Sequence, residues 1–263
     1  MSSLLKETIF LKNIAILPET GPIIVLHVDD EPDFADLTSI YLERESDEIE
    51  VITADCVEAG LEHLETDAID CIVSDYDMPH RNGLDLLAIV REEYPELPFI
   101  LFTGKGSEEI ASEAISAGVT DYLQKKPGTD QYTVLANRIQ NAASQYKSKR
   151  ETERMGIALQ TVDAGIAFLN EDGQFIYVNP AYEEIFGYAP GELTGQPIDI
   201  LYPDELAHQA YEDILPTVPQ EGEWTGESIH THKDGTRLIV NQKFSYCSAR
   251  MLLCFILNVT EQN

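Results

Sequence analysis

The sequence predicts an α/β domain with a doubly wound, five-stranded parallel sheet, joined by a helix to a smaller antiparallel α+β domain. The first prediction rests on five short apolar runs that alternate with amphipathic segments of helical period. The second rests on a change, after about residue 155, to paired strands around tight turns. The chain has 263 residues and 43% apolar content, enough for two cores. We expect an N-terminal extension at 1–21, an α/β domain at 22–146, a helical linker at 147–154 and a second domain at 155–263.

The five expected strands of the first domain are almost continuously apolar, which is typical of strands covered on both faces. In chain order they are IIVLHV (23–28), IEVITA (49–54), IDCIVS (69–74), PFILFT (98–103) and VTDYLQ (119–124). Parallel pairing follows because an amphipathic segment separates each run from the next.

The segments between these strands repeat apolar residues every three or four positions, which indicates one buried helix face each. The faces consist of Phe34, Leu37, Ile40 and Tyr41; Val57, Leu61 and Leu64; Leu84, Leu87 and Val90; Ile110, Ala111, Ala114 and Ile115; and Tyr132, Leu135, Ile139, Ala142 and Tyr146. The last face continues into the polar run KSKRETERMG. We interpret it as packing on its own sheet, with a short coiled coil between two chains as the alternative.

The second domain carries the signals of two β-hairpins. Asp-Gly pairs at 172–173 and 234–235 each stand between short strand-like runs. The Asn-Pro pair at 179–180 has the chemistry of a helix start, and Gly187 can end that helix. A last apolar run at 251–260 completes a small antiparallel sheet.

The charge balance excludes some classes of partner. Asp and Glu number 47 against 17 Lys and Arg, for a formal net charge of -30, and the acids are spread through both halves. Such a surface repels nucleic acid and anionic lipid, so we expect neither DNA binding nor membrane binding. The balance also resembles that of proteins from salt-accumulating extreme halophiles, in which concentrated cations screen the carboxylates.

The apolar runs and the cysteine spacing of the sequence bear on the location of the protein and on the redox state of its thiols. No run of about 18 apolar residues occurs, and charged residues interrupt the opening segment, so we expect a cytoplasmic protein. The four cysteines show neither a C-x-x-C pair nor the spacing of a zinc site, and we interpret them as reduced, mostly packed thiols. They are Cys56, Cys71, Cys247 and Cys254.

Acidic residues follow the first and third strands of the predicted parallel sheet. Asp29 and Asp30 come directly after the first strand, and Asp75 follows the third. If these strands are neighbours, the carboxylates converge at the edge where such sheets bind ligands. Three carboxylates there need a cation, and oxygen ligands with open positions suit Mg²⁺. We therefore expect a divalent ion as the counter-charge to Asp75.

The other strands supply groups that complement this acidic edge. The fourth strand ends at Thr103, which offers a hydroxyl, and the fifth leads to Lys125, which offers an ammonium. A carboxylate nucleophile, a metal, a hydroxyl and a lysine can together accept a phosphoryl group as an aspartyl phosphate. The alternative is that Asp29, Asp30 and Asp77 are helix caps or turn residues and that Thr103 and Lys125 are ordinary loop residues.

Residues 22–146 resemble a response-regulator receiver domain of two-component signalling, which has a flavodoxin-like fold. The matching motifs are VLHVDDEPD, VSDYDMPHRNGLDLL, ILFTGKG and AGVTDYLQKKP. The resemblance implies that Asp75 is the phosphoacceptor. It also implies that Mg²⁺ is held by the side chains of Asp29, Asp30 and Asp75 and by the backbone carbonyl of Asp77.

The same resemblance gives roles to three further residues. Thr103 and Lys125 would contact the phosphoryl oxygens, and Tyr122 would be the aromatic residue whose rotamer follows Thr103. Receivers usually have lysine immediately before proline, which here is Lys126. We favour Lys125, because the spacing from the strand decides which side chain reaches the site.

Residues 155–263 resemble a PAS domain, whose motifs specify a fold rather than a chemistry. Ile198 stands where flavin-linking members have a reactive cysteine, so covalent flavin chemistry is not expected. We interpret His208, His230 and His232 as residues of exposed helices or strands rather than haem ligands. His27 and Cys71 of the first domain are interpreted as packed. The aromatic residues of the second domain are interpreted as core or dimer-surface residues; they are Tyr182, Phe186, Tyr188, Trp224 and Phe244.

The function these resemblances imply is phosphorelay signalling. A sensor histidine kinase would phosphorylate Asp75, and the PAS domain would signal through the helix at 132–153 to other PAS or receiver proteins or to a second copy. We expect no enzymatic activity beyond self-dephosphorylation, since the sequence shows no kinase or helix-turn-helix pattern.

Two alternatives stay open. In the first, a small PAS ligand modulates receiver phosphorylation. In the second, the acidic edge is a Mg²⁺-dependent phosphohydrolase with Asp75 as nucleophile and Asp77 as acid/base. The kinase, stimulus, PAS ligand and oligomeric state are not specified by the sequence, nor is the role of residues 1–21 or whether the chain is part of a longer kinase.

Overall fold

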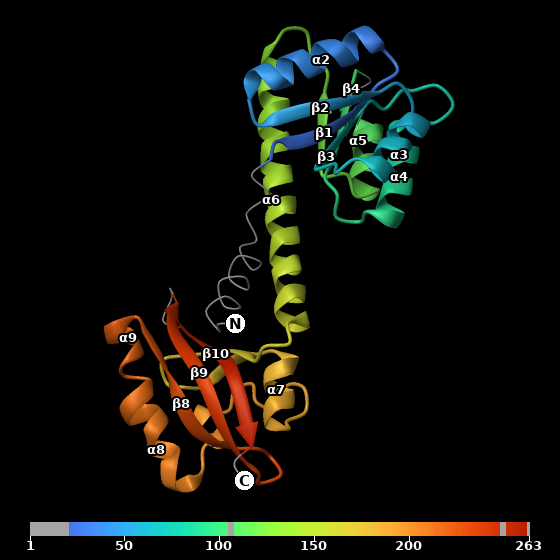
Figure 1. Ribbon diagram of the computed structural model, residues 1–263. Helices are drawn as coiled ribbons and strands as arrows, with labels where there is room; N and C mark the ends of the chain where they lie inside the picture. The colour runs from blue at the N-terminus through green and yellow to red at the C-terminus, as the bar shows by residue number, and fades with distance from the viewer. Residues whose placement is uncertain (1–20, 105–107, 248–250, 262–263) are drawn as a thin grey trace. The chain divides into compact units, whose positions relative to one another are not determined.

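A computed structural model of the chain describes residues 21–104, 108–247 and 251–261 (Figure 1). It divides into two compact units, Met1–Glu153 and Arg154–Asn263. Nearly all of the predicted N-terminal extension lies outside the described residues. Of the helices that are described, none is long and apolar enough to cross a membrane.

The first unit contains the predicted five-stranded parallel sheet. Its strands are β1 (Ile23–Val28), β2 (Ile49–Ala54), β3 (Cys71–Ser74), β4 (Phe99–Thr103) and β5 (Asp121–Gln124), in the spatial order β2-β1-β3-β4-β5. All four pairings are parallel, and β1 lies between β2 and β3. The predicted fold class is confirmed, and the first and third strands are neighbours.

Helices cover both faces of this sheet (Figure 1). They are α2 (Pro32–Glu45), α3 (Val57–Thr66), α4 (Gly83–Glu93), α5 (Glu108–Ser116) and α6 (Asp130–Thr161). Helices α2 and α6 bury Leu42, Leu135 and Ile139 on one face. Helices α3, α4 and α5 bury their apolar residues on the other face, including Leu86 and Ala114.

The third strand begins two residues later than its apolar pattern predicts, because Asp70 is used differently. Asp70 Oδ2 accepts a hydrogen bond from the backbone N–H of Ile24 at 2.9 Å. The same oxygen lies 3.0 Å from the ammonium of Lys147 on α6, and both side chains are largely buried. The predicted helix at 132–146 and the predicted linker at 147–154 form one continuous helix, α6.

The second unit contains a five-stranded antiparallel sheet, as predicted. The strands are β6 (Ile166–Leu169), β7 (Phe175–Val178), β8 (Glu223–Thr231), β9 (Arg237–Cys247) and β10 (Met251–Glu261), in the order β7-β6-β10-β9-β8. Gly173 and Gly235 have φ values of 76° and 92°, the conformation that the two hairpin turns require.

Short helices complete the second unit. They are α7 (Pro180–Phe186), α8 (Ala207–Gln209), α9 (Val218–Glu221) and single turns at Ile198–Leu201, Asp204–Leu206 and Ala210–Ile214. Asn179 caps α7 through a hydrogen bond from the N–H of Tyr182, and Gly187 ends α7 in the left-handed conformation. Tyr182, Phe186 and Phe244 are core residues of this unit.

Candidate phosphoacceptor site

The site lies where β1 and β3 end. Val28 pairs with Ser74 as the last residues of the two strands. The backbone continues in register one residue further, because the N–H of Asp75 donates to the carbonyl of Val28 at 2.8 Å. Asp29 and Asp75 therefore leave adjacent strands at one edge of the sheet. The side chain of Asp29 is 1% exposed and that of Asp75 is 9% exposed, so both carboxylates need compensating partners.

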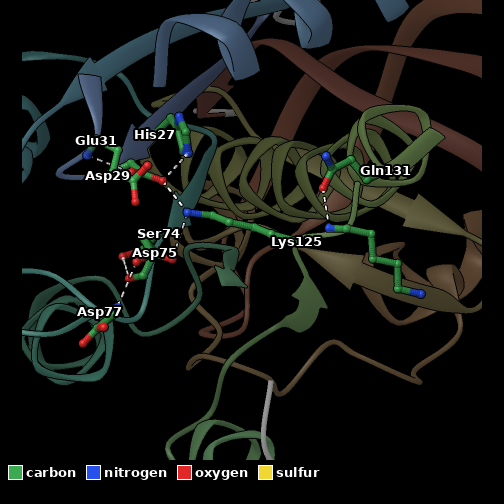
Figure 2. A network of polar contacts seen from close by, with 9 residues as sticks. His27, Asp29, Glu31, Ser74, Asp75, Asp77, Lys125 and Gln131 are labelled. Carbon is green, nitrogen blue, oxygen red and sulfur yellow. Dashed lines mark hydrogen bonds and ion pairs between the residues drawn. The ribbon is translucent and has the colours of Figure 1, made fainter. Parts of the chain in front are cut away.

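The loop after β3 is built closely around Asp75. A Cβ atom at Gly83 would lie 2.2 Å from the carbonyl oxygen of Asp75, so only glycine permits this approach. The same carbonyl accepts a hydrogen bond from the Ser74 hydroxyl at 2.8 Å. On the side chain, Asp75 Oδ2 accepts a hydrogen bond from the N–H of Asp77 at 2.9 Å. Asp77 is exposed, and its side chain points away from Lys125 (Figure 2).

The turn after β1 holds Asp29 in a similar way. Asp29 Oδ1 accepts a hydrogen bond from the N–H of Glu31 at 3.0 Å. Helix α2 then starts at Pro32, because the fixed φ of proline suits the first turn of a helix. Asp30 is half-buried beside this turn.

Lys125 brings the positive charge of the site. It directly follows β5, and its backbone N–H donates to the carbonyl of Thr103 at 2.8 Å. Its Nζ lies 2.7 Å from Asp29 Oδ2 and 3.0 Å from Asp75 Oδ1. Figure 2 shows the end of the Lys125 side chain directed toward both carboxylates. Burial alone would lower the pKa of Lys125, but its contacts with the two carboxylates raise that pKa above its ordinary value.

The neighbouring Lys126 lies outside this network. It is exposed, and its backbone N–H donates to Gln131 Oε1 at 2.8 Å. Thr103 is the fully buried last residue of β4, adjacent to β3. Tyr122 is half-buried on β5 and packs against the core cluster formed with α3, α4 and α5.

Lys125 supplies a positive charge next to Asp75, with Nζ 3.0 Å from Oδ1. Across residues 21–104, 108–247 and 251–261, no three Asp, Glu, His or Cys side chains are close enough together to hold a metal. The donor set nevertheless suits Mg²⁺, because Asp75 Oδ1 is buried and accepts no hydrogen bond of favourable geometry. Asp29 and Asp30 follow β1 and Asp75 follows β3, so these three carboxylates lie at the carboxyl ends of two neighbouring strands.

Two residues near the site were given no role by the sequence. His27 is completely buried on β1, as predicted, with Nε2 3.8 Å from Asp29 Oδ2, and burial lowers its pKa to about 4. Phe34 was predicted only as part of a helix face, yet its ring lies against the Lys125 ammonium, 4.2 Å from Nζ to the ring centroid. For His27, the sequence signal was a histidine within an otherwise apolar strand. Nothing in the sequence indicated that Phe34 lies next to Lys125.

In the second unit, the prediction for His230 was wrong. His230 is completely buried on β8, and its Nε2 lies 2.8 Å from Ser228 Oγ and 3.1 Å from Gln242 Nε2. Its ring centroid is 4.3 Å from that of Tyr202. Its neighbours along the strand, Ile229 and Thr231, do not indicate which face of the strand points inward. Burial lowers the pKa of His230 to about 3.

Two protein-family models match the chain. Residues 25–137 match the response regulator receiver domain, and residues 163–261 match a PAS domain.

Curated proteins with similar sequences include three response regulators. The transcriptional regulatory protein CpxR of Escherichia coli K12 is 31% identical over 179 residues, which cover 68% of this chain and 70% of CpxR. FleR of Pseudomonas aeruginosa is 40% identical over 76 residues, covering 29% of this chain and 16% of FleR. NtrC of Proteus hauseri is 30% identical over 141 residues, covering 54% and 27%. The chain thus spans less than a third of FleR and NtrC. These relatives do not support a halophilic origin, which stays a prediction.

Solved structures with a similar fold match about half of this chain. A receiver domain from Clostridium thermocellum is 29% identical with a TM-score of 0.43, covering 48% of this chain and 98% of its own. TrrA from Thermotoga maritima, solved with Mg²⁺ and BeF, is 25% identical with a TM-score of 0.40, covering 44% and 97%.

Proposed function

Since this chain belongs to the response-regulator family, with a receiver domain at 25–137 followed by a PAS domain at 163–261, we propose that it is a cytoplasmic phosphorelay protein that accepts a phosphoryl group on Asp75. One observation carries the proposal. The Asp75 carboxylate is buried at the carboxyl end of β3 and is paired with Lys125, which also pairs with Asp29. We further propose that the receiver extends over residues 22–146 and the PAS domain over 155–263.

The proposed chemistry uses the side chains in separate roles. An oxygen of Asp75 attacks the phosphorus of a phosphohistidine on a sensor histidine kinase, the P–N bond breaks as the P–O bond forms, and the released imidazole nitrogen takes up a proton from solvent. Lys125 and Thr103 are the groups proposed to hold the phosphoryl oxygens. The Lys125 ammonium already lies 3.0 Å from Asp75 Oδ1.

We propose that Asp29, Asp30, Asp75 and the backbone carbonyl of Asp77 hold Mg²⁺. When bound, the ion neutralises negative charge on the transferring group. Lys125 is then free to turn from a carboxylate to a phosphoryl oxygen. Tyr122 is proposed as the aromatic residue whose rotamer reports this change at Thr103.

The output is proposed to run through α6 into the PAS domain. Helix α6 is anchored in the first unit by the buried pair of Lys147 and Asp70, 3.0 Å apart. Its last turn is anchored in the second unit by Asn179, whose Nδ2 donates to the carbonyl of Leu159 at 3.1 Å. Other PAS or receiver proteins, or a second copy, are the proposed recipients.

Mass spectrometry tests the proposal. The full chain is incubated with acetyl phosphate and Mg²⁺, and we expect the added mass of one phosphoryl group on the wild type and none on Asp75→Asn. Asp36→Asn is the matched control, because Asp36 is an exposed aspartate of α2. Equal phosphorylation of the wild type and Asp75→Asn would refute the proposal.

A second candidate function is ligand sensing by the PAS domain. It is favoured by the buried polar cluster of Ser228, His230 and Gln242 inside the second unit. Native mass spectrometry of purified protein would detect a retained small molecule. If one is found, equal phosphorylation rates before and after its removal would contradict this candidate.

A further inference from the structure

Two carboxylates and one aromatic ring lie close to the ammonium of Lys125. The carboxylates of Asp29 and Asp75 lie on one side of Nζ, at 2.7 and 3.0 Å. The face of the Phe34 ring lies against Nζ as well, with its centroid 4.2 Å away. An aromatic face carries partial negative charge and attracts a cation within about 6 Å of its centroid. Phe34 therefore contributes an attraction that holds the ammonium at the site.

The position of Phe34 is fixed by the same turn that holds Asp29. The carbonyl of Glu31 accepts a hydrogen bond from the N–H of Phe34 at 3.0 Å, in the first turn of α2. The N–H of Glu31 in turn donates to Asp29 Oδ1. One short segment thus places both a carboxylate and an aromatic face next to the same ammonium.

Neighbouring rings keep Phe34 in place. Its centroid lies 6.0 Å from that of Phe102 on β4 and 6.5 Å from that of His27 on β1, both in tilted arrangements. Phe102 is also 5.9 Å from Lys125 Nζ. Phe102 and His27 are almost completely buried. Packing against these two rings keeps the face of Phe34 directed at the ammonium.

We propose that Phe34 is a positioning residue for phosphoryl transfer. Its ring face keeps the Lys125 ammonium beside Asp75 while Asp75 is being phosphorylated. This inference rests on the proposed function. It assigns to Phe34 a role that acts only through Lys125. Without the ring, the flexible lysine side chain would lose one of its three contacts and spend more time in solvent.

The test measures the dissociation constant of beryllofluoride, a phosphoryl mimic, by calorimetry with the full chain and saturating Mg²⁺. We expect Phe34→Leu to bind about fivefold more weakly, which corresponds to a cation–π contribution of about 1 kcal/mol. Phe34→Tyr keeps the aromatic face and should bind like the wild type. In a Lys125→Met background, Phe34→Leu should have no further effect, since the cycle isolates the pair.

A series of fluorinated phenylalanines at position 34 separates electrostatics from packing. Fluorine withdraws charge from the ring face while changing its shape little, so we expect affinity to fall stepwise as fluorine atoms are added. Circular dichroism checks that each variant is folded. Because this series preserves the packing, it decides the question even if Phe34→Leu does not fold.

The outcomes distinguish this inference from the proposed function. If the wild type fails to bind beryllofluoride, the proposed function is wrong. If the wild type binds, but the fluorinated series binds equally well or more tightly, the role of Phe34 is refuted while the phosphoacceptor site stands. A loss of the same size in the Lys125→Met background would show that Phe34 acts on packing rather than on the ammonium.

Discussion

Replacing Lys125 with methionine removes the positive charge between Asp29 and Asp75 while keeping an unbranched apolar stem. The Lys125 side chain is 17% exposed and that of Asp29 is 1% exposed. Removing one partner of a buried ion pair leaves the other charge uncompensated, at a cost of about 3–5 kcal/mol. We expect about 3 kcal/mol of lost stability, the lower end, because the ammonium is partly hydrated.

Urea unfolding of the full chain measures this loss. Circular dichroism follows both units, whereas the fluorescence of Trp224, the single tryptophan, follows only the second unit. We expect Lys125→Met to shift the transition of the first unit and to leave the Trp224 transition in place. Saturating Mg²⁺ should recover part of the loss, because the ion supplies another counter-charge to the carboxylates.

Lys126→Met is the matched control. Lys126 is exposed, and its backbone N–H donates to Gln131 Oε1 at 2.8 Å. Surface substitutions of this kind change stability by about 0.5 kcal/mol or less. Equal midpoints for the two variants, or a larger loss for Lys126→Met, would refute the assignment of Lys125 as the counter-charge.

Four further predictions follow from the structure and the composition. Burial lowers the pKa of His230 from 6.5 to about 3, so between these pH values the unfolded chain binds a proton that the folded unit does not. The free energy of unfolding should therefore fall as the pH drops, by roughly 2 kcal/mol at about pH 5. Urea midpoints of His230→Gln should depend less on pH than those of the wild type. Gly83→Ala should lower the free energy of unfolding by about 2 kcal/mol or more and abolish phosphorylation, because its Cβ would lie 2.2 Å from the Asp75 carbonyl oxygen. The control Gly156→Ala places its Cβ in open space on α6 and should raise the melting temperature slightly. Asn179→Ala should lower the free energy of unfolding of the second unit by about 2–3 kcal/mol, because the buried side-chain amide makes hydrogen bonds to α6, β6 and α7. Urea unfolding measures this loss, and a value below about 0.5 kcal/mol would contradict the structural role of Asn179. With a net charge of -30, the melting temperature should rise between dilute buffer and about 1 M KCl, and a flat salt dependence would remove the comparison with halophilic proteins.

Local patterns in the sequence were sufficient to predict the fold and to nominate candidate acids at one edge of the sheet. Apolar runs and helical periods identified both sheets, because burying a strand or a helix face imposes its period on the sequence. Acids directly after the first and third strands identified Asp29 and Asp75 as candidates, because the carboxyl ends of parallel strands meet at one edge. The turn residues of the second unit were equally readable, since Asp-Gly pairs and an Asn-Pro helix start have specific backbone requirements.

Only the tertiary structure showed which groups touch. Lys125 Nζ lies within 3.0 Å of carboxylates on two other strands, and Phe34 covers it from a helix about 90 residues away in sequence. His230 turned out to be buried, because the strand pairing, not its own neighbours, decides which face points inward. Secondary structure depends on periodic local preferences that a sequence records directly. A counter-charge depends on distances set by strand order and loop closure, and these exist only once the chain has folded.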